Sequence, residues 1–275
     1  MRAFSAGLTG AAAGWRIEYA ASTGSTNQLA VQAARAGAEH GHVFAADEQT
    51  AGRGRRGRSW ISPHGKGLLF STVAHGVGLT PDRMGWVALS AGLASAEALR
   101  SRTGIDIRLK WPNDLVVMNV GRGRPPWLKL GGILVESSLT ERFEAAYAVI
   151  GVGVNVLHEP TDLPCDARTP PTSLQLQTDR SLCRRDLLKT VLEQLAKRIS
   201  WIADPVHFAA LSNEIRVAFA DWWTDWEIRV HTNAGERRGF YSDLDAHGRL
   251  CLCDGQGHKE MLSDAEWLDA QSIKR

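Results

Sequence analysis

The segment 49–60 constrains this chain more than any other stretch of its sequence, because it reads QTAGRGRRGRSW. Its four arginines fall within six positions, with glycines between them and Trp60 at the end. Glycine lets the backbone approach a ligand closely, and arginine presents fixed N–H donors that suit phosphate and carboxylate groups. The indole of Trp60 offers a flat face on which an aromatic ring can stack. The segment therefore predicts a loop that closes over a small anionic, aromatic ligand, with a nucleotide as the first candidate.

Two other interpretations of this segment compete with that one. A basic run is often a solvated face or a nucleic-acid patch, but the chain carries 32 Lys and Arg against 30 Asp and Glu, so its positive charge is local and favours a site. Gly52, Gly54 and Gly57 also match the G-x-G-x-x-G fingerprint of dinucleotide-binding folds, which requires a helix to open at the last glycine. The chain continues instead with turn-forming residues over 58–65, so the dinucleotide-binding interpretation fails on context.

The length of 275 residues allows one large domain or two unequal ones. No apolar run approaches the ~18 residues of a membrane span, and residues 1–14 lack the continuous apolar core of a signal peptide. We therefore expect residues 1–14 to be a flexible lead-in and the protein to be cytoplasmic, with no membrane partner. The four cysteines lack paired C-x-x-C spacing and are expected to stay reduced, and Cys251-x-Cys253 is more typical of alternate strand residues than of metal ligands.

The hydrophobic pattern predicts strands and helices that are followed by a small all-β module. Apolar residues at helical spacing predict helices over 28–38, 84–102, 184–202 and 205–223. Alternating or continuous apolar runs predict strands over 15–20, 42–47, 67–74, 105–111, 115–118, 132–138 and 143–154. In the C-terminal module, glycine-containing turns separate short predicted strands over 227–232, 236–244 and 249–253.

Three further segments share the polar and glycine-rich character of the arginine loop. Residues 110–114 (KWPND) place a cation, an amide and a carboxylate at the end of one strand. Residues 129–136 (KLGGILVE) set a lysine before a glycine pair, and residues 151–155 (GVGVN) remove side chains at a strand end. Each pattern is weak alone, because a lysine at a strand end is more often solvated and such glycines are more often turn residues. No G-x-x-x-x-G-K-[ST] motif occurs, so a nucleotide would not be held by a P-loop.

Taken in this order with residues 25–27 (STN), these segments resemble the biotin protein ligases, also called biotin–[acetyl-CoA-carboxylase] ligases. The resemblance implies an α+β fold, with a central mixed or antiparallel sheet flanked by helices, of the class II synthetase-like biotin/lipoate ligase type. It implies a catalytic ligase domain over 15–224 and a small SH3-like β-barrel over 225–275. Members of the family condense biotin with ATP to biotinoyl-5′-AMP, and then pass biotin to one lysine of the biotin carboxyl carrier domain of a carboxylase.

The resemblance also implies roles for individual residues. Lys129 is expected to reach the biotin carboxylate and the α-phosphoryl oxygens, and together with Arg55 it is the implied catalytic group. Biotin binding is implied for Ser25, Thr26, Asn27, Gln49, Arg53, Gly54, Arg55, Lys129, Gly132, Gly151 and Gly153, where the last three glycines are expected to leave space for the rings of biotin. ATP binding is implied for Arg55, Arg56, Arg58, Trp60, Lys110, Asn113 and Asn155. Asp114 is implied to meet the Mg²⁺ that ATP carries.

The expected substrates and partners are ATP with Mg²⁺, biotin and the carrier domain, with no tightly bound prosthetic group, and the chain is expected to be a monomer or a weak homodimer. Residues 1–14 leave no room for the helix-turn-helix domain of some family members, so no specific DNA binding or repression is expected. The connection 119–128, with Arg122 and Arg124, is interpreted as a solvated excursion. Two alternatives remain open: a lipoate–protein ligase of the same fold, and a nucleic-acid-binding module, against which the near-neutral charge argues.

Overall fold

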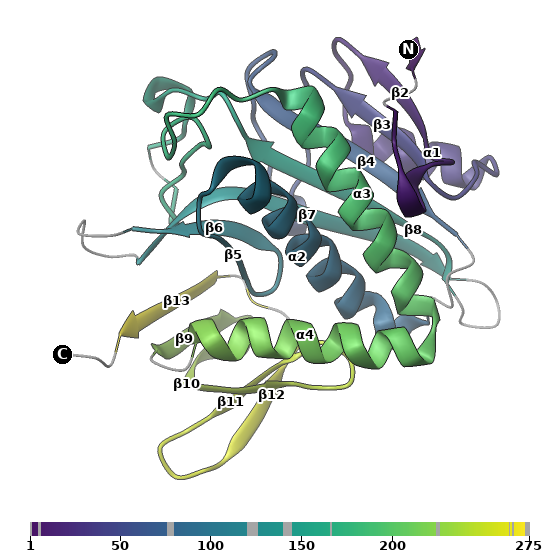
Figure 1. Cartoon of the computed structure of the whole chain (residues 1–275). Helices are drawn as coiled ribbons and strands as arrows, with labels where there is room; N and C mark the ends of the chain where they lie inside the picture. The colour runs from purple at the N-terminus through teal and green to yellow at the C-terminus, as the bar shows by residue number, and fades with distance from the viewer. Residues whose placement is uncertain are drawn as a thin grey trace.

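The computed structural model of the chain describes residues 2–4, 7–75, 80–119, 126–139, 145–165, 167–223, 226–263, 265 and 267–272. Within these residues, eight strands form the larger sheet, in the order β1-β2-β3-β4-β8-β7-β6-β5 (Figure 1). Strands β2 and β3 are parallel and the other neighbouring pairs are antiparallel, which confirms the expected mixed sheet. The strands are β1 (Arg2–Phe4), β2 (Arg16–Ala20), β3 (His42–Ala46), β4 (Gly67–Ala74), β5 (Ile107–Lys110), β6 (Asp114–Met118), β7 (Trp127–Leu139) and β8 (Ala145–Asn155).

Helices cover the two faces of this sheet unequally. On one face, Phe44, Val73 and Val149 from three neighbouring strands pack against Ala30 and Ala34 of helix α1 (Thr26–Arg35). Because side chains alternate along a strand, the adjacent residues point to the other face, where α2 (Met84–Thr103) and α3 (Arg184–Ala203) lie across the sheet (Figure 1). Helix α1 contacts mainly β3, β4 and β8. On this face of the sheet, α1 therefore leaves most of β7 uncovered, and the cavity described below lies there.

Helix α1 begins two residues before its predicted start. Ser25 adopts an extended backbone and its side chain accepts a hydrogen bond from the backbone N–H of Gln28 at 3.4 Å, which is the arrangement of an N-terminal cap. The cap places Thr26 and Asn27 in the first helical turn, where both side chains are buried. The polar run at 25–27 is therefore part of the helix start, and it borders the sheet.

Helix α4 (Pro205–Trp223) leads into a second, antiparallel sheet, which lies beside α4 in Figure 1. Its described strands have the order β12-β11-β10-β9-β13, with bounds β9 (Trp226–Thr232), β10 (Gly235–Leu244), β11 (Leu250–Cys253), β12 (Lys259–Leu262) and β13 (Trp267–Ser272). This sheet is consistent with the expected small barrel. It is fastened to the rest of the chain by indole N–H groups, because Trp86 donates to the carbonyl of Ala246 at 2.8 Å and Trp111 to that of Gly248 at 3.2 Å. The domain division near residue 225 stays a prediction.

The described part of segment 1–14 differs from the expected flexible lead-in. Residues Arg2–Phe4 form β1, which pairs with β2 and satisfies backbone groups that would otherwise be unpaired at the edge of the sheet. Thr9 is also held, because its backbone N–H and its hydroxyl both donate to Glu193 Oε1, at 2.9 and 2.6 Å. The sequence did not predict β1, β12 or β13. Arg122 and Arg124 of the 119–128 connection lie outside the described residues.

The described residues bear on the cysteines, on metal ligands and on membrane-spanning helices. Cys251 and Cys253 are alternate residues of β11, as their spacing predicted, and all four cysteines are free. In the described part of the chain, no group of three His, Cys, Asp or Glu side chains is placed to hold a metal ion. Within the same part, no helix has both the length and the apolar character that crossing a membrane requires.

Candidate active site

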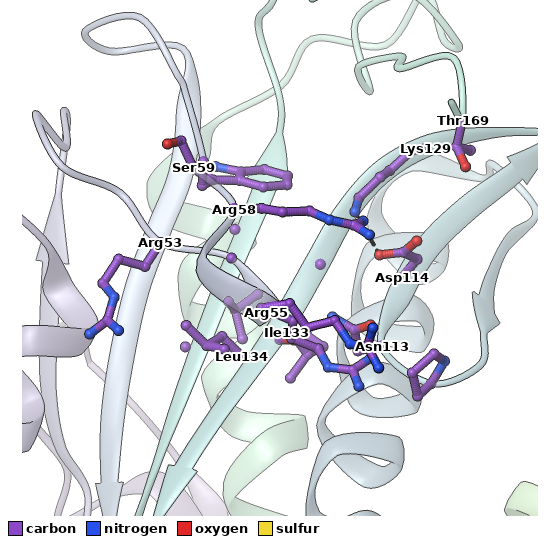
Figure 2. A pocket seen from close by; sticks show the side chains of 18 of the residues that line it. Arg53, Arg55, Arg58, Ser59, Asn113, Asp114, Lys129, Ile133, Leu134 and Thr169 are labelled. Atoms are coloured by element: carbon purple, nitrogen blue, oxygen red, sulfur yellow. Dashed lines mark hydrogen bonds and ion pairs between the residues drawn. The ribbon is translucent and has the colours of Figure 1, made fainter. Parts of the chain in front are cut away.

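A cavity of about 870 Å³ lies against β7 and β8, on the face of the sheet that carries α1. Figure 2 shows side chains that line it. The four sequence segments singled out by their motifs, together with the start of α1, all contribute to its wall. Of the residues to which the sequence assigned a role, those that line the cavity are Ser25, Thr26, Asn27, Gln49, Arg53, Gly54, Arg55, Arg56, Arg58, Trp60, Lys110, Asn113, Asp114, Lys129, Gly132, Gly151 and Gly153. Segments far apart in the sequence therefore converge on one site.

Asn155 is the exception. It is buried and does not line the cavity, and its side-chain N–H donates to the backbone carbonyl of Thr172 at 2.9 Å. The same stretch of chain is held by β7, because Lys129 N donates to the carbonyl of Pro170 and Thr172 N donates to the carbonyl of Lys129, both at 2.8 Å. Asn155 thus helps to fix residues 167–172 next to the cavity. Its implied contact with ATP stays a prediction.

The arginine loop folds back on itself as a small hairpin. Gly54 N donates to the carbonyl of Arg58 at 2.6 Å, and Trp60 N donates to the carbonyl of Gly52 at 2.9 Å. A Cβ atom at Gly52 would lie 2.3 Å from the Trp60 carbonyl oxygen, so this crossing needs glycine. Arg56 has a φ of 56°, a left-handed conformation that no other described residue except glycine adopts.

Three arginines of the loop reach three different elements. Arg53 Nη1 lies 3.6 Å from Glu136 Oε1 on β7, and Arg55 Nη1 donates to Asn113 Oδ1 at 3.0 Å in the turn between β5 and β6. Arg56 is bonded to the second sheet, where its Nη1 donates to Asn233 Oδ1 at 3.2 Å.

The fourth arginine of the loop points into the cavity. Figure 2 shows the side chain of Arg58 directed toward Asp114 and Lys129. Since the other three guanidinium groups also belong to residues that line the cavity, the loop places its positive charge on the wall of the site.

One carboxylate holds two lysines in the wall of the cavity. Asp114 Oδ1 lies 2.7 Å from Lys129 Nζ, and Asp114 Oδ2 lies 3.5 Å from Lys110 Nζ. Burial opposes ionisation of Asp114, but the two lysines outweigh it and hold the pKa of this carboxyl below its usual value. The Lys129 side chain is 29% exposed, so the structure leaves its ammonium accessible from the cavity.

Lys110, for which ATP binding was implied, is buried in the wall of the cavity, and that role stays a prediction. Its side chain is 4% exposed, and Nζ donates to the carbonyl of Leu268 on β13 at 3.3 Å and lies 5.4 Å from the ring centroid of Trp127. Burial lowers the pKa of Lys110, and the charge of Asp114 partly offsets that effect. The ammonium therefore contacts the second sheet, and its charge stabilises the ionised carboxylate of Asp114.

Polar groups at the start of α1, together with Gln49, line another part of the cavity, which we call its polar end. Gln49 Oε1 accepts from the backbone N–H of Thr26 at 2.8 Å and from its hydroxyl at 3.0 Å, and that hydroxyl lies 2.9 Å from Ser71 Oγ. Asn27 Nδ2 donates to Glu136. Asn27 Oδ1 is buried and has no hydrogen-bond partner among the described residues. A buried acceptor in this state is unusual in a protein, and here it belongs to a residue that lines the cavity.

The glycines of β8 make room for protein side chains. A Cβ atom on Gly151 would lie 2.5 Å from Asn27 Oδ1, and one on Gly153 would lie 2.8 Å from Trp60 Cε2. Gly132 is less crowded, since its nearest atom would be the Asn113 carbonyl oxygen at 3.7 Å. Gly151 and Gly153 thus allow Asn27 and the Trp60 indole to approach the sheet closely.

Sequence reasoning gave no role to several residues of this site. Glu136 contacts both Asn27 and Arg53, and its only signal was an acidic residue within an apolar strand. Ser71 lies within a continuous apolar strand without any motif. Arg168 and Asn233 line the cavity itself, and no local pattern distinguishes them.

The fold and the cavity define an α+β protein with a cavity on its main sheet that is lined by arginine and lysine side chains. The sequence model of the biotin/lipoate A/B protein ligase family matches residues 19–155. The chain is 32% identical over 251 residues to the biotin–[acetyl-CoA-carboxylase] ligase of Mycobacterium tuberculosis, covering 89% of this chain and 86% of that protein. It is 32% identical over 256 residues to the Paracoccus denitrificans enzyme of the same name, covering 90% and 97% of the two chains.

A solved structure agrees with these sequence relatives. The biotin protein ligase of Aquifex aeolicus in complex with biotin and ATP superposes with a TM-score of 0.72 at 24% identity, covering 93% of this chain and 98% of that one. This likeness concerns the fold. The chain belongs to the biotin/lipoate A/B protein ligase family, as an enzyme of the biotin protein ligase type.

Proposed function

We propose that this enzyme activates biotin with ATP as biotinoyl-5′-AMP, releases pyrophosphate, and transfers biotin to one lysine of a biotin carboxyl carrier domain. The observation that carries the proposal is the position of Lys129, whose ammonium borders the cavity that the arginine loop covers. The sequence relatives named as biotin–[acetyl-CoA-carboxylase] ligases support the same acceptor.

The first step brings two anions together. A carboxylate oxygen of biotin forms a bond to the α-phosphorus of ATP, the bond from that phosphorus to the pyrophosphate oxygen breaks, and pyrophosphate leaves. Repulsion between the reacting anions must be offset by fixed cations in a site shielded from water. Lys129 is suited to this role, because an incoming anion can share its ammonium with Asp114. Arg55 and Arg58 add positive charge on the loop side of the same cavity.

The second step consumes the mixed anhydride. The amine of the carrier lysine attacks the biotin carbonyl carbon, an amide forms, and AMP leaves with the electron pair of the broken bond while the amine loses a proton. Because the anhydride is also open to attack by water, a loop that covers it protects it until the carrier arrives. We assign this covering role to the arginine loop, in which Arg55 lines the cavity and donates to Asn113.

The polar end of the cavity suits the ureido group of biotin. A ureido group presents two N–H donors and one carbonyl acceptor. The buried Asn27 Oδ1, which has no partner among the described residues, would accept from one of those donors. Ser25, Thr26 and Gln49 complete this end, and the contacts of Thr26 with Gln49 fix the orientation of both side chains.

The nucleotide would occupy the other end, between Trp60 and Asp114. The indole of Trp60 offers a stacking surface, and the Lys129 ammonium lies 5.9 Å from its ring centroid, so the cation and the aromatic face border the same space. Mg²⁺ is bound in such sites by one or two carboxylates together with substrate phosphates. Asp114 fits that requirement as an ionised carboxylate on the cavity wall, and it would help to hold a phosphate-bound Mg²⁺ that neutralises phosphate charge.

We also propose that the arginine loop is not a DNA-binding surface. Its arginines line a cavity, and Arg53 and Arg55 contact Glu136 and Asn113 of the same chain. Specific recognition of duplex DNA requires an element that is presented to a groove. Sequence-specific binding of DNA that depends on biotin, at physiological salt, would contradict this proposal.

Exchange of labelled pyrophosphate into ATP tests the proposed function directly. We expect exchange that depends on biotin and is not supported by lipoate, followed by labelling of a carrier domain at one lysine. Exchange with lipoate in place of biotin would assign the chain to the other branch of its family. No exchange with either acid would overturn the proposal.

A further inference from the structure

The turn between β9 and β10 is a rigid part of the second sheet. Only Asn233 and Ala234 connect the two strands, and Gly235 has a φ of +109°, which closes the turn without strain. Thr232 Oγ1 donates to the carbonyl of Gly235 at 2.9 Å and accepts from the backbone N–H of Ala234 at 3.2 Å. The position of Asn233 is therefore set by the sheet.

Asn233 lies on the wall of the cavity, as does Leu268 of the same second sheet, whereas most other lining residues come from the large sheet and its loops. Its Oδ1 accepts a hydrogen bond from Arg56 Nη1 at 3.2 Å. Arg56 adopts a left-handed backbone, which is unfavourable for a residue other than glycine. Contacts of its side chain help to offset that cost, and the bond to Asn233 is one of them.

A second hydrogen bond attaches the second sheet, called the small sheet below, to the same site. Strand β13 pairs with β9, and the carbonyl of Leu268 on β13 accepts from Lys110, which pairs with Asp114. Asp114 in turn holds Lys129. The small sheet therefore meets the site at its lysine pair and at its arginine loop, and neither point of contact can shift freely with respect to the other.

We propose that Asn233 is a positioning residue, which fastens the arginine loop over the cavity from the second sheet. Arg53 and Arg55 attach the loop to the large sheet, and Arg56 attaches it to the small one. Loss of this bond weakens the attachment of the loop to the second sheet. The inference rests on the proposed function for its catalytic consequence: an opened loop releases the biotinoyl-adenylate sooner, while its synthesis at Lys129 is little changed.

Amide hydrogen exchange of the full chain over residues 52–60, without any ligand, tests the fastening itself. In Asn233→Ala we expect about two- to fivefold faster exchange there, which is the effect of one exposed hydrogen bond to a charged donor. Asn233→Asp places a carboxylate opposite Arg56 and is expected to slow exchange below that of the wild type. Ala234→Ser, in the same turn, is the matched control and should leave the loop unchanged.

A double-mutant cycle excludes a general loosening of the small sheet. If the effect runs through Arg56, then adding Asn233→Ala to Arg56→Ala changes loop exchange no further. Unchanged exchange in Asn233→Ala, or an additive effect in the double variant, would overturn the inference. These measurements need no substrate, so their outcome is independent of whether the chain forms the adenylate.

The catalytic consequence is measured separately. In Asn233→Ala we expect the rate of biotinoyl-adenylate release to rise by about the same two- to fivefold, with synthesis in a single turnover nearly unchanged. Equal release rates in Asn233→Ala and the wild type would overturn the catalytic part. Absence of the adenylate from the wild type would instead contradict the proposed function.

Discussion

Lys129 Nζ lies 2.7 Å from Asp114 Oδ1, and the other oxygen of the same carboxylate lies 3.5 Å from Lys110 Nζ. One carboxylate therefore forms ion pairs with two lysines, the partly exposed Lys129 and the buried Lys110. The two ammonium groups, that of Lys129 above all, keep Asp114 ionised, and Asp114 orients Lys129. An anion that enters the cavity meets an ammonium that is already placed and charged, which lowers the cost of organising the site.

Replacing Lys129 by alanine should slow adenylate formation by about 10²–10³-fold, the usual effect of removing one electrostatic donor from a reacting centre. The fold should persist, because Lys129 is partly exposed and its backbone contacts with 170–172 remain. Pyrophosphate exchange measures the rate, and circular dichroism checks the fold. Lys66→Ala is a suitable control, since Lys66 pairs with Asp162 and does not line the cavity. Wild-type exchange in Lys129→Ala would remove the residue from the mechanism.

Asp114→Ala should destabilise the protein by about 2–4 kcal/mol, because it leaves the buried ammonium of Lys110 without its counter-charge. The double variant Asp114→Ala with Lys110→Met should recover much of this loss, since no buried charge then remains. Urea unfolding of the two single variants and the double variant gives the comparison. A double variant no more stable than Asp114→Ala would show that Lys110 is not the cause.

Two glycines of β8 provide a matched pair of substitutions. Gly151→Ala would press on Asn27 Oδ1 and should raise the KM for biotin, whereas Gly153→Ala would press on the Trp60 indole and should raise the KM for ATP. Overpacking of this kind costs about 1–3 kcal/mol, so a change of about tenfold is expected in each case. Steady-state kinetics with each substrate varied in turn measures the effects. The same pattern in both variants would contradict the assignment of the two ends of the cavity.

The buried His158 should make the folded state less stable in acid. It is fully buried, its Nε2 lies 3.0 Å from Ser62 Oγ, and burial lowers its pKa from 6.5 to about 4. Below pH 6.5 the unfolded chain takes up a proton that the folded chain does not, so stability falls as the pH decreases from about 6.5 toward 4, by about 2–3 kcal/mol.

The pH dependence of urea unfolding of His158→Gln checks this expectation, because glutamine does not titrate in that range. The variant should lose most of the slope between pH 6.5 and 4 that the wild type shows. An unchanged slope would assign the acid sensitivity to other groups.

Much of the fold could be predicted from local pattern. The continuous apolar run of β4 and the helical spacing of α2 predicted those elements within a residue or two of their observed bounds. The strands that were missed lack such a pattern: three of the four residues of β12 are exposed, and β1 is only three residues long. Their strand conformation depends on the neighbour with which each pairs, and a neighbour cannot be seen in a short window of sequence.

The sequence by itself determined the chemistry that this protein can perform, because the arginine loop, Lys129, Asp114 and the polar run at 25–27 are fixed by residue type. Tertiary structure decided which partner each group has. It directed Lys110 to Leu268 of the second sheet and Asn155 to the carbonyl of Thr172, and it brought Asn233 to the arginine loop. The physical reason is that a hydrogen bond or an ion pair depends on separations of a few ångströms, and those separations are set by how whole sheets and helices pack together.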